Sequence, residues 1–156
     1  MMEIKFRQAS LEDLPTLYKF EQAIIAAERP FDPTLKPDPI NYYDLREMIQ
    51  SRNTEVIVGV FKDEIICSAY VSLNDSKSYL KHEKYAYLGF MYVKPEFRGK
   101  GINQKIMGEL KEWALVKGVN EVRLDVYNDN NSAIRAYEKA GFNKHLIEMR
   151  MKIEGI

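Results

Sequence analysis

A short glycine-containing segment, set between an aromatic run and a helical pattern, constrains the fold of this chain more than any other feature. Tyr87 to Val93 is apolar and aromatic, and the chain then turns at Pro95 and continues as Arg98-Gly99-Lys100-Gly101. Apolar residues recur at helical spacing from Ile102 onward. A strand, a glycine turn and a helix N-terminus in this order predict an anion site. The reason is that the first helical turn has unpaired N–H groups at the positive end of the helix dipole.

The two common phosphate-binding motifs do not match this segment. A P-loop needs a longer spacer before its Gly-Lys-Ser/Thr sequence than Gly99-Lys100-Gly101 provides. A dinucleotide fingerprint needs a third glycine, and Gln104 stands at that position. From these residues alone, an ordinary glycine turn between a strand and a helix stays open as the alternative.

The length and charge of the chain limit its organisation and its partners. With 156 residues, we expect one domain over residues 1–156. Lys plus Arg and Asp plus Glu number 23 each, so no excess charge favours nucleic acid or a membrane surface. No stretch is long and apolar enough to span a bilayer, and the first residues lack a signal-peptide core. We therefore expect a cytoplasmic protein with neither a nucleic-acid nor a membrane partner. A homodimer is compatible with these patterns.

Few residues are available for metal or thiol chemistry. Cys67 is the only cysteine and lies in an apolar run, where a buried, inert thiol is expected. His82 and His145 are the only histidines, and neither belongs to a metal-ligand spacing. We therefore expect no metal cofactor and no hydrolytic triad.

The hydrophobic periodicities predict an α/β (α+β) fold with the element order βααβββαβαβ. Strands are predicted at residues 4–8, 55–61, 65–73, 87–93, 121–127 and 142–153. Helices are predicted after Ser10, at residues 42–49, from residue 102 to Gly118, and at residues 132–140. Helices interspersed among strands imply a mixed sheet with helices on both faces.

A second motif follows the strand predicted at residues 121–127. The segment Asn128-Asp129-Asn130-Asn131-Ser132 precedes a short helical run that contains Tyr137 and ends at Gly141. Together with Val93-x-Pro95 and Arg98-x-x-Gly101, this block resembles the GNAT superfamily of acetyl-CoA-dependent N-acetyltransferases. The resemblance implies a mixed, mostly antiparallel sheet. It also implies acetyl-CoA (coenzyme A) as the acyl donor, with no metal, and an acceptor that is a primary amine of a small molecule, peptide or protein.

The resemblance assigns the cofactor to two neighbouring segments. The pyrophosphate of coenzyme A would be held by a loop and helix start made of Arg98, Gly99, Lys100, Gly101, Ile102, Asn103 and Gln104. The pantetheine arm would pair with the backbone of Met91, Tyr92 and Val93, where an N–H would also stabilise a tetrahedral oxyanion. Asn103 is a departure, since the family usually has Gly or Ala there, and its side chain must point away from the phosphate.

The resemblance also assigns Asn130 to a cofactor contact and Tyr137 to the general acid. Core packing on a helical face is the alternative for Tyr137. For the general base, some family members place a glutamate where Tyr87 stands, and others place an acidic residue where Asp125 stands. A surface carboxylate paired with Arg123 or a lysine is the alternative for Asp125. A weakly basic acceptor could also react without a strong base.

Acceptor selection is expected in the first two helices, the proline-containing segment after the first helix, and the loop at residues 74–84. Four acids in this region, Glu28, Asp32, Asp38 and Asp44, could attract a cationic amine, or could simply belong to a solvated surface. Two other functions stay open. One is a non-catalytic acyl-CoA-binding sensor or partner domain, and the other is a nucleic-acid-binding module that uses the basic loop.

Overall fold

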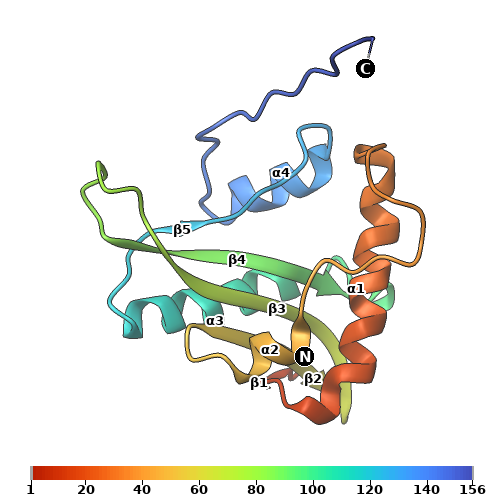
Figure 1. Ribbon diagram of the computed structural model, residues 1–156. Coiled ribbons are helices and arrows are strands. Elements are labelled where there is room, and N and C mark those ends of the chain that lie inside the picture. The colour runs from red at the N-terminus through yellow and green to blue at the C-terminus, as the bar shows by residue number, and fades with distance from the viewer. Residues whose placement is uncertain (1, 156) are drawn as a thin grey trace. The chain divides into compact units, whose positions relative to one another are not determined.

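The computed structural model describes residues 2–155 and divides after Asp125 into two units, each treated by itself (Figure 1). Within these described residues, the first unit contains a five-stranded sheet and three α-helices, and the second contains one α-helix. The strands are β1 (Lys5–Gln8), β2 (Thr54–Phe61), β3 (Glu64–Asp75), β4 (Lys84–Val93) and β5 (Val122–Arg123). The helices are α1 (Leu14–Glu28), α2 (Leu45–Gln50), α3 (Ile102–Val116) and α4 (Asn131–Lys139). One domain over residues 1–156 stays a prediction.

The sheet has the strand order β1-β2-β3-β4-β5, as the mixed, mostly antiparallel expectation requires. The first four strands are antiparallel neighbours, and β5 alone runs parallel to β4. Lys62 and Asp63 join β2 to β3 with positive φ angles of 49° and 64°, the backbone of a tight two-residue hairpin. The antiparallel register follows from this turn, and four consecutive residues at the centre of each strand are buried, as expected for strands that are covered on both faces.

Helices cover both faces of the sheet, which confirms the predicted fold class. In Figure 1, α1 and α2 lie on one side of the strands and α3 lies on the other. On the first side, the buried cluster consists of Ala9, Leu14, Leu17, Phe20, Leu45, Val56, Val58 and Phe90. Helix α3 buries Ile102, Ile106, Met107, Leu110 and Ala114 against the strands. Each fully buried aliphatic side chain contributes about 2 kcal/mol, so the two cores hold β4 firmly between layers.

Helix α2 begins at Leu45, whereas the periodicity predicts a start at residue 42. The buried carboxylate of Glu21 accepts hydrogen bonds from the backbone N–H groups of Tyr42 and Tyr43 at 2.9 and 2.8 Å. Those N–H groups are therefore held by α1. Asp44 then caps the helix by accepting from the N–H of Glu47 at 3.1 Å.

Two predicted strands differ from the structure. Strand β5 covers only Val122–Arg123, because its pairing with β4 is limited to Ala86 and Tyr87. The final strand, predicted at residues 142–153, is not formed. Its apolar side chains Leu146, Ile147, Met149, Met151 and Ile153 are between 65% and 88% exposed. Alternation alone does not make a strand, since the backbone must also pair with a neighbour, and the described part of the second unit contains no strand.

Within residues 2–155, no helix has the length and apolar character needed to cross a membrane.

Candidate active site

Strand β4 carries a β-bulge near its end. Tyr70 of β3 pairs with Gly89, whereas Ser68 pairs with Tyr92, so two residues of β4 lie opposite one residue of β3. The first of the two, Phe90, has a φ of +55°, which is rare for a residue with a side chain. The buried Ser68 hydroxyl donates to the carbonyl of Phe90 at 3.1 Å. This hydrogen bond holds the bulge and turns the following backbone.

The bulge lies where the outer edge of β4 is open. Strand β5 pairs with β4 only at Ala86 and Tyr87, and among residues 2–155 no other strand pairs beyond that point. The N–H of Lys94 donates to the carbonyl of Ile66 in β3 at 2.9 Å. Alternation along the strand therefore directs the N–H groups of Met91 and Val93 away from β3, toward the open edge. This is the backbone geometry expected for pairing with an extended ligand arm.

The glycine loop connects this strand to α3. Gly99 and Gly101 have φ angles of +76° and +75°, which a side chain would strain. A Cβ at either glycine would meet no described heavy atom within 4 Å, so both positions face open space. The first intrahelical bond runs from Lys105 N–H to the carbonyl of Gly101. The backbone N–H groups at the start of α3 precede that bond and form the predicted anion site.

The basic side chains of the loop fold back onto the protein. The Nε atom of Arg98 donates to the carbonyl of Val93 at 2.9 Å, and its guanidinium lies 5.6 Å from the ring centre of Tyr92. The Nζ atom of Lys100 lies 5.8 Å from the ring centre of Phe97. Arg98 thus links the loop to the end of β4 by a hydrogen bond, and its positive charge stays close to the loop. The sequence indicated the charge, but a hydrogen bond to a carbonyl five positions earlier leaves no sequence signal.

The start of α3 separates its side chains cleanly. Ile102 is buried, whereas Asn103 and Gln104 are exposed. The Asn103 side chain therefore lies on the outer surface of the helix and takes no part in the packing beneath the loop.

Asp125 has a defined partner. Its Oδ2 atom accepts the hydroxyl of Tyr87 at 2.9 Å. The alternative partner, Arg123, instead contacts Glu121 at 2.6 Å and places its guanidinium 3.9 Å from the ring centre of Tyr85. Burial raises the pKa of Tyr87, and the hydrogen bond to Asp125 raises it further. Tyr87 is therefore a neutral phenol that donates to a carboxylate at neutral pH.

The second unit contains the other two predicted site residues. The Oδ1 atom of Asn130 accepts from the N–H of Ala133 at 3.2 Å and so caps α4. Tyr137 is half-buried, and its ring meets Phe142 edge-on at 5.9 Å. A structural role in the second unit is thus visible for both residues. Their roles toward a cofactor stay predictions.

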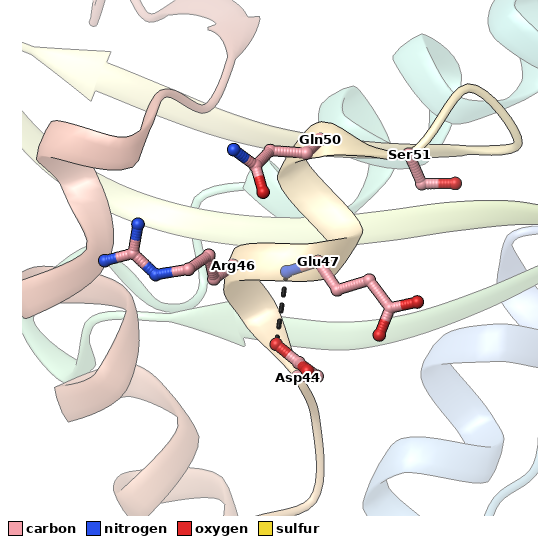
Figure 2. A pocket seen from close by; sticks show the side chains of 5 residues that line it. All are labelled: Asp44, Arg46, Glu47, Gln50 and Ser51. Atoms are coloured by element: carbon pink, nitrogen blue, oxygen red, sulfur yellow. Dashed lines mark hydrogen bonds between the residues drawn. The ribbon is translucent and has the colours of Figure 1, made fainter.

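The four acids expected near the acceptor have local partners, and that of Glu28 is Tyr42. Asp44 caps α2, Asp38 contacts Arg29 at 2.5 Å, and Asp32 accepts from the N–H of Thr34 at 2.9 Å. Figure 2 shows a polar hollow around α2, lined by Asp44, Arg46, Glu47, Gln50 and Ser51. The Asp44 carboxylate in this hollow caps α2, and none of the residues predicted to hold the cofactor lines the hollow.

Two further features were not anticipated from the sequence. One is the buried Glu21, which holds the backbone before α2. The other is a group of tyrosines around the bulge, formed by Tyr43, Tyr70 and Tyr87. Because the three residues are far apart in the chain, no sequence pattern indicated that they would lie together, apart from the mixed polarity of tyrosine.

A mostly antiparallel sheet, with a bulged strand that leads through a glycine turn into a helix, defines an acetyltransferase-type α/β fold. The family model described as the acetyltransferase (GNAT) family matches residues 20–142. The chain therefore belongs to this family.

Relatives and solved structures agree with that membership. A thialysine N-epsilon-acetyltransferase of Sus scrofa is 46% identical over 55 residues, covering 35% of this chain and 32% of that enzyme. This match thus spans about a third of the length of the relative. A spermidine N(1)-acetyltransferase of Thermoplasma acidophilum is 28% identical over 151 residues, covering 90% of this chain and 89% of that enzyme. A predicted acetyltransferase of Clostridium acetobutylicum, solved with acetyl-CoA, has a TM-score of 0.71 at 17% identity and covers 96% of each chain. At this identity the likeness concerns the fold.

Proposed function

We propose that the protein transfers the acetyl group of acetyl-CoA directly to a primary amine. The observation that carries this proposal is the bulge of β4, whose free backbone edge leads straight into the glycine loop and the N-terminus of α3. An extended thioester arm and a pyrophosphate need these two backbone features in this order. The relatives that act on thialysine and spermidine support an amine as the acceptor.

The loop would hold the cofactor mainly through its backbone. Gly99 and Gly101 face open space, so phosphate oxygens can approach the N–H groups of Ile102, Asn103 and Gln104. The charges of Arg98 and Lys100 would add attraction. The N–H groups of Met91 and Val93 would pair with the pantetheine arm, with Tyr92 between them.

In the reaction, the neutral amine attacks the thioester carbonyl and forms a tetrahedral oxyanion. An N–H on the open edge of β4 stabilises that charge. The C–S bond then breaks, and Tyr137 donates a proton to the thiolate of coenzyme A. The proton that the acetylated nitrogen loses as the amide forms returns Tyr137 to its phenol form through solvent. A tyrosine near pKa 10 is a weaker acid than a thiol near 8.5, a gap of about 2 kcal/mol that burial of the thiolate narrows.

Proton removal from the acceptor would fall to Asp125 and Tyr87. A lysine-type ammonium costs about 4.6 kcal/mol to deprotonate at neutral pH, and an α-ammonium costs about 1.4 kcal/mol. Because the Tyr87 hydroxyl donates to Asp125, its oxygen presents lone pairs to an ammonium. A proton that moves to the Tyr87 oxygen can displace the hydroxyl proton onto Asp125, which is exposed and can pass it to water.

Two measurements test the proposal together. Coenzyme A binding is measured by calorimetry, and thiol release from acetyl-CoA is followed with a panel of primary amines. Amine-dependent thiol release supports the transferase. Tight coenzyme A binding without thiol release across the panel would favour the acyl-CoA-binding sensor instead.

A further inference from the structure

Three tyrosines, one from the segment before α2, one from β3 and one from β4, meet at the bulge of β4. The rings of Tyr43 and Tyr70 lie 5.7 Å apart between centres, and those of Tyr70 and Tyr87 lie 6.3 Å apart. The Tyr43 ring also packs edge-on against Phe90, at 5.4 Å. A Cβ at Gly89 would lie only 2.8 Å from the hydroxyl of Tyr70, so that phenol rests directly on the β4 backbone. The glycine thus makes room for a hydroxyl one residue before the bulge.

These tyrosines are neutral hydroxyl groups rather than phenolates. Burial is the main cause that raises the pKa of each of them. The neighbouring Tyr70 and Glu28 also raise the pKa of Tyr43, and Asp125 raises that of Tyr70 and Tyr87. Phenol oxygens can accept hydrogen bonds from an ammonium, and the ring faces can attract its charge.

Carboxylates flank the tyrosine row at its two ends. Asp125 accepts the hydroxyl of Tyr87 at one end. At the other end, the charge of the half-buried Glu28 acts on Tyr43. Burial raises the pKa of Glu28, which means that its charged form is poorly solvated and would gain from a cation. A hydrogen bond between Glu28 and Tyr42 lowers that pKa and only partly offsets the effect of burial.

The position of Tyr43 is fixed from below. Glu21, completely buried in α1, holds the N–H groups of Tyr42 and Tyr43 through one carboxylate oxygen. The ring of Tyr43 is therefore set against Phe90 by a buried hydrogen-bonded anchor, and the row is a rigid platform.

We propose that this row selects an acceptor with two amino groups on one slender chain. The reacting amine binds at Tyr87 and Asp125, and the second ammonium binds at Tyr43 and Glu28, with Tyr70 between them. This inference rests on the proposed acetyl transfer and adds its substrate class. Three tyrosine rings leave an aromatic surface suited to alkyl carbons, while the two carboxylates match the two charges.

The test compares α,ω-diaminoalkanes with n-alkylamines of the same carbon number, using thiol release from acetyl-CoA. For the best chain length, kcat/KM of the diamine should exceed that of the monoamine by at least about tenfold. The reason is that the monoamine has no second ammonium to bind at Tyr43 and Glu28. Glu28→Gln should remove most of this preference, because it should lower kcat/KM for the diamine far more than kcat/KM for the monoamine. Tyr43→Phe, which removes one hydroxyl, should lower the preference in the same direction.

Asp44→Asn is the matched control, since it removes a charge beside Tyr43 but keeps a good helix cap. It should leave the preference intact. Equal rates for diamines and monoamines, or an unchanged preference in Glu28→Gln, would overturn the diamine site. The proposed acetyl transfer would still stand in that case, because thiol is released. If no amine supports thiol release, diamine binding measured by calorimetry decides between the two ideas. If the parent protein binds the diamine and Glu28→Gln does not, the diamine site stands and acetyl transfer is rejected. If the parent protein binds no diamine, the diamine site and acetyl transfer are both rejected.

Discussion

The hydroxyl of Tyr87 in β4 donates to the carboxylate of Asp125 just beyond β5, at 2.9 Å. Strands β4 and β5 pair for only two residues, so this bond joins them at the point where they begin to separate. The carboxylate fixes the direction of the hydroxyl proton, and the lone pairs of the phenol oxygen can still accept a hydrogen bond. Tyr87, which stands where some family members place a glutamate, is thus hydrogen-bonded to a carboxylate that follows the next strand.

Removing either partner should slow amine acetylation. Tyr87→Phe and Asp125→Asn should each lower kcat/KM for the amine by about 10- to 100-fold, within the usual contribution of proton transfer. Coenzyme A affinity should stay within error in both variants. Because the two groups act as one unit, the double variant should lose little more than the worse single variant. Strictly additive losses in this cycle, measured by steady-state kinetics, would show that the two side chains act independently.

Tyr137→Phe should lower turnover without weakening coenzyme A. The substitution keeps the ring and its edge-on contact with Phe142, so α4 should keep its packing. We expect kcat to fall by about 100-fold, as for a lost general acid. The fall in kcat should be smaller with acetyl donors whose thiols have lower pKa values, since such thiolates leave without needing a proton. Turnover equal to that of the parent protein would leave Tyr137 with packing alone.

Gly101→Glu should abolish coenzyme A binding. The new side chain would strain a residue with a φ of +75° and place negative charge at the start of α3. Gly108→Glu is the control, because it makes the same change inside α3 where a Cβ also meets open space. Calorimetry should show binding in the control and none in Gly101→Glu. Equal affinities in the two variants would mean that the loop serves another purpose.

Ser68→Ala should destabilise the bulge. It removes the hydroxyl that donates to the buried carbonyl of Phe90 at 3.1 Å. An unsatisfied buried carbonyl costs about 1–3 kcal/mol, which urea unfolding can resolve. Ser72→Ala, which loses a weaker contact of 3.3 Å to Asn74, should cost less. An unchanged free energy of unfolding in Ser68→Ala would argue that the hydroxyl does not hold the bulge.

The acid stability of the chain should depend on Asp13. Arg7 donates to this carboxylate at 2.7 and 3.0 Å, and that interaction, ahead of the Ser10 contacts, lowers the pKa of Asp13. A lowered pKa stabilises the fold above the unfolded value near 4 and loses that contribution as pH falls through the folded value. Asp13→Asn should therefore cost about 1 kcal/mol at pH 7, a modest figure because Arg7 is 46% exposed. Unfolding of the two proteins should converge in acid, and a difference that persists unchanged there would contradict the ion pair as its cause.

Much of the fold can be predicted from local patterns, because many of its elements have a hydrophobic periodicity of their own in the sequence. Strands β2 and β3, their tight turn and the amphipathic α3 are of this kind. The delayed start of α2 is not, since it depends on Glu21 reaching across from α1. The final strand was predicted wrongly for a related reason. The alternation at residues 142–153 is a local pattern, but a strand also needs a neighbour to pair with, which no local pattern specifies.

The candidate site divides in a similar way. The glycine loop and the bulged strand are contiguous in sequence, so the resemblance to the family could locate both. The Tyr43–Tyr70–Tyr87 row joins residues from three separate segments of the chain, and only the fold brings them together. Asn130 shows the remaining difficulty, because an asparagine before a helix reads equally as a cap and as a ligand contact.

The central claim is tested most directly by incubating the protein with acetyl-CoA and a primary diamine, then measuring free coenzyme A and acetylated amine in the same sample. The account predicts equal amounts of the two products in the parent protein and neither product with Gly101→Glu. Coenzyme A binding by the parent protein with no acetylated amine, across diamines and monoamines alike, would contradict it.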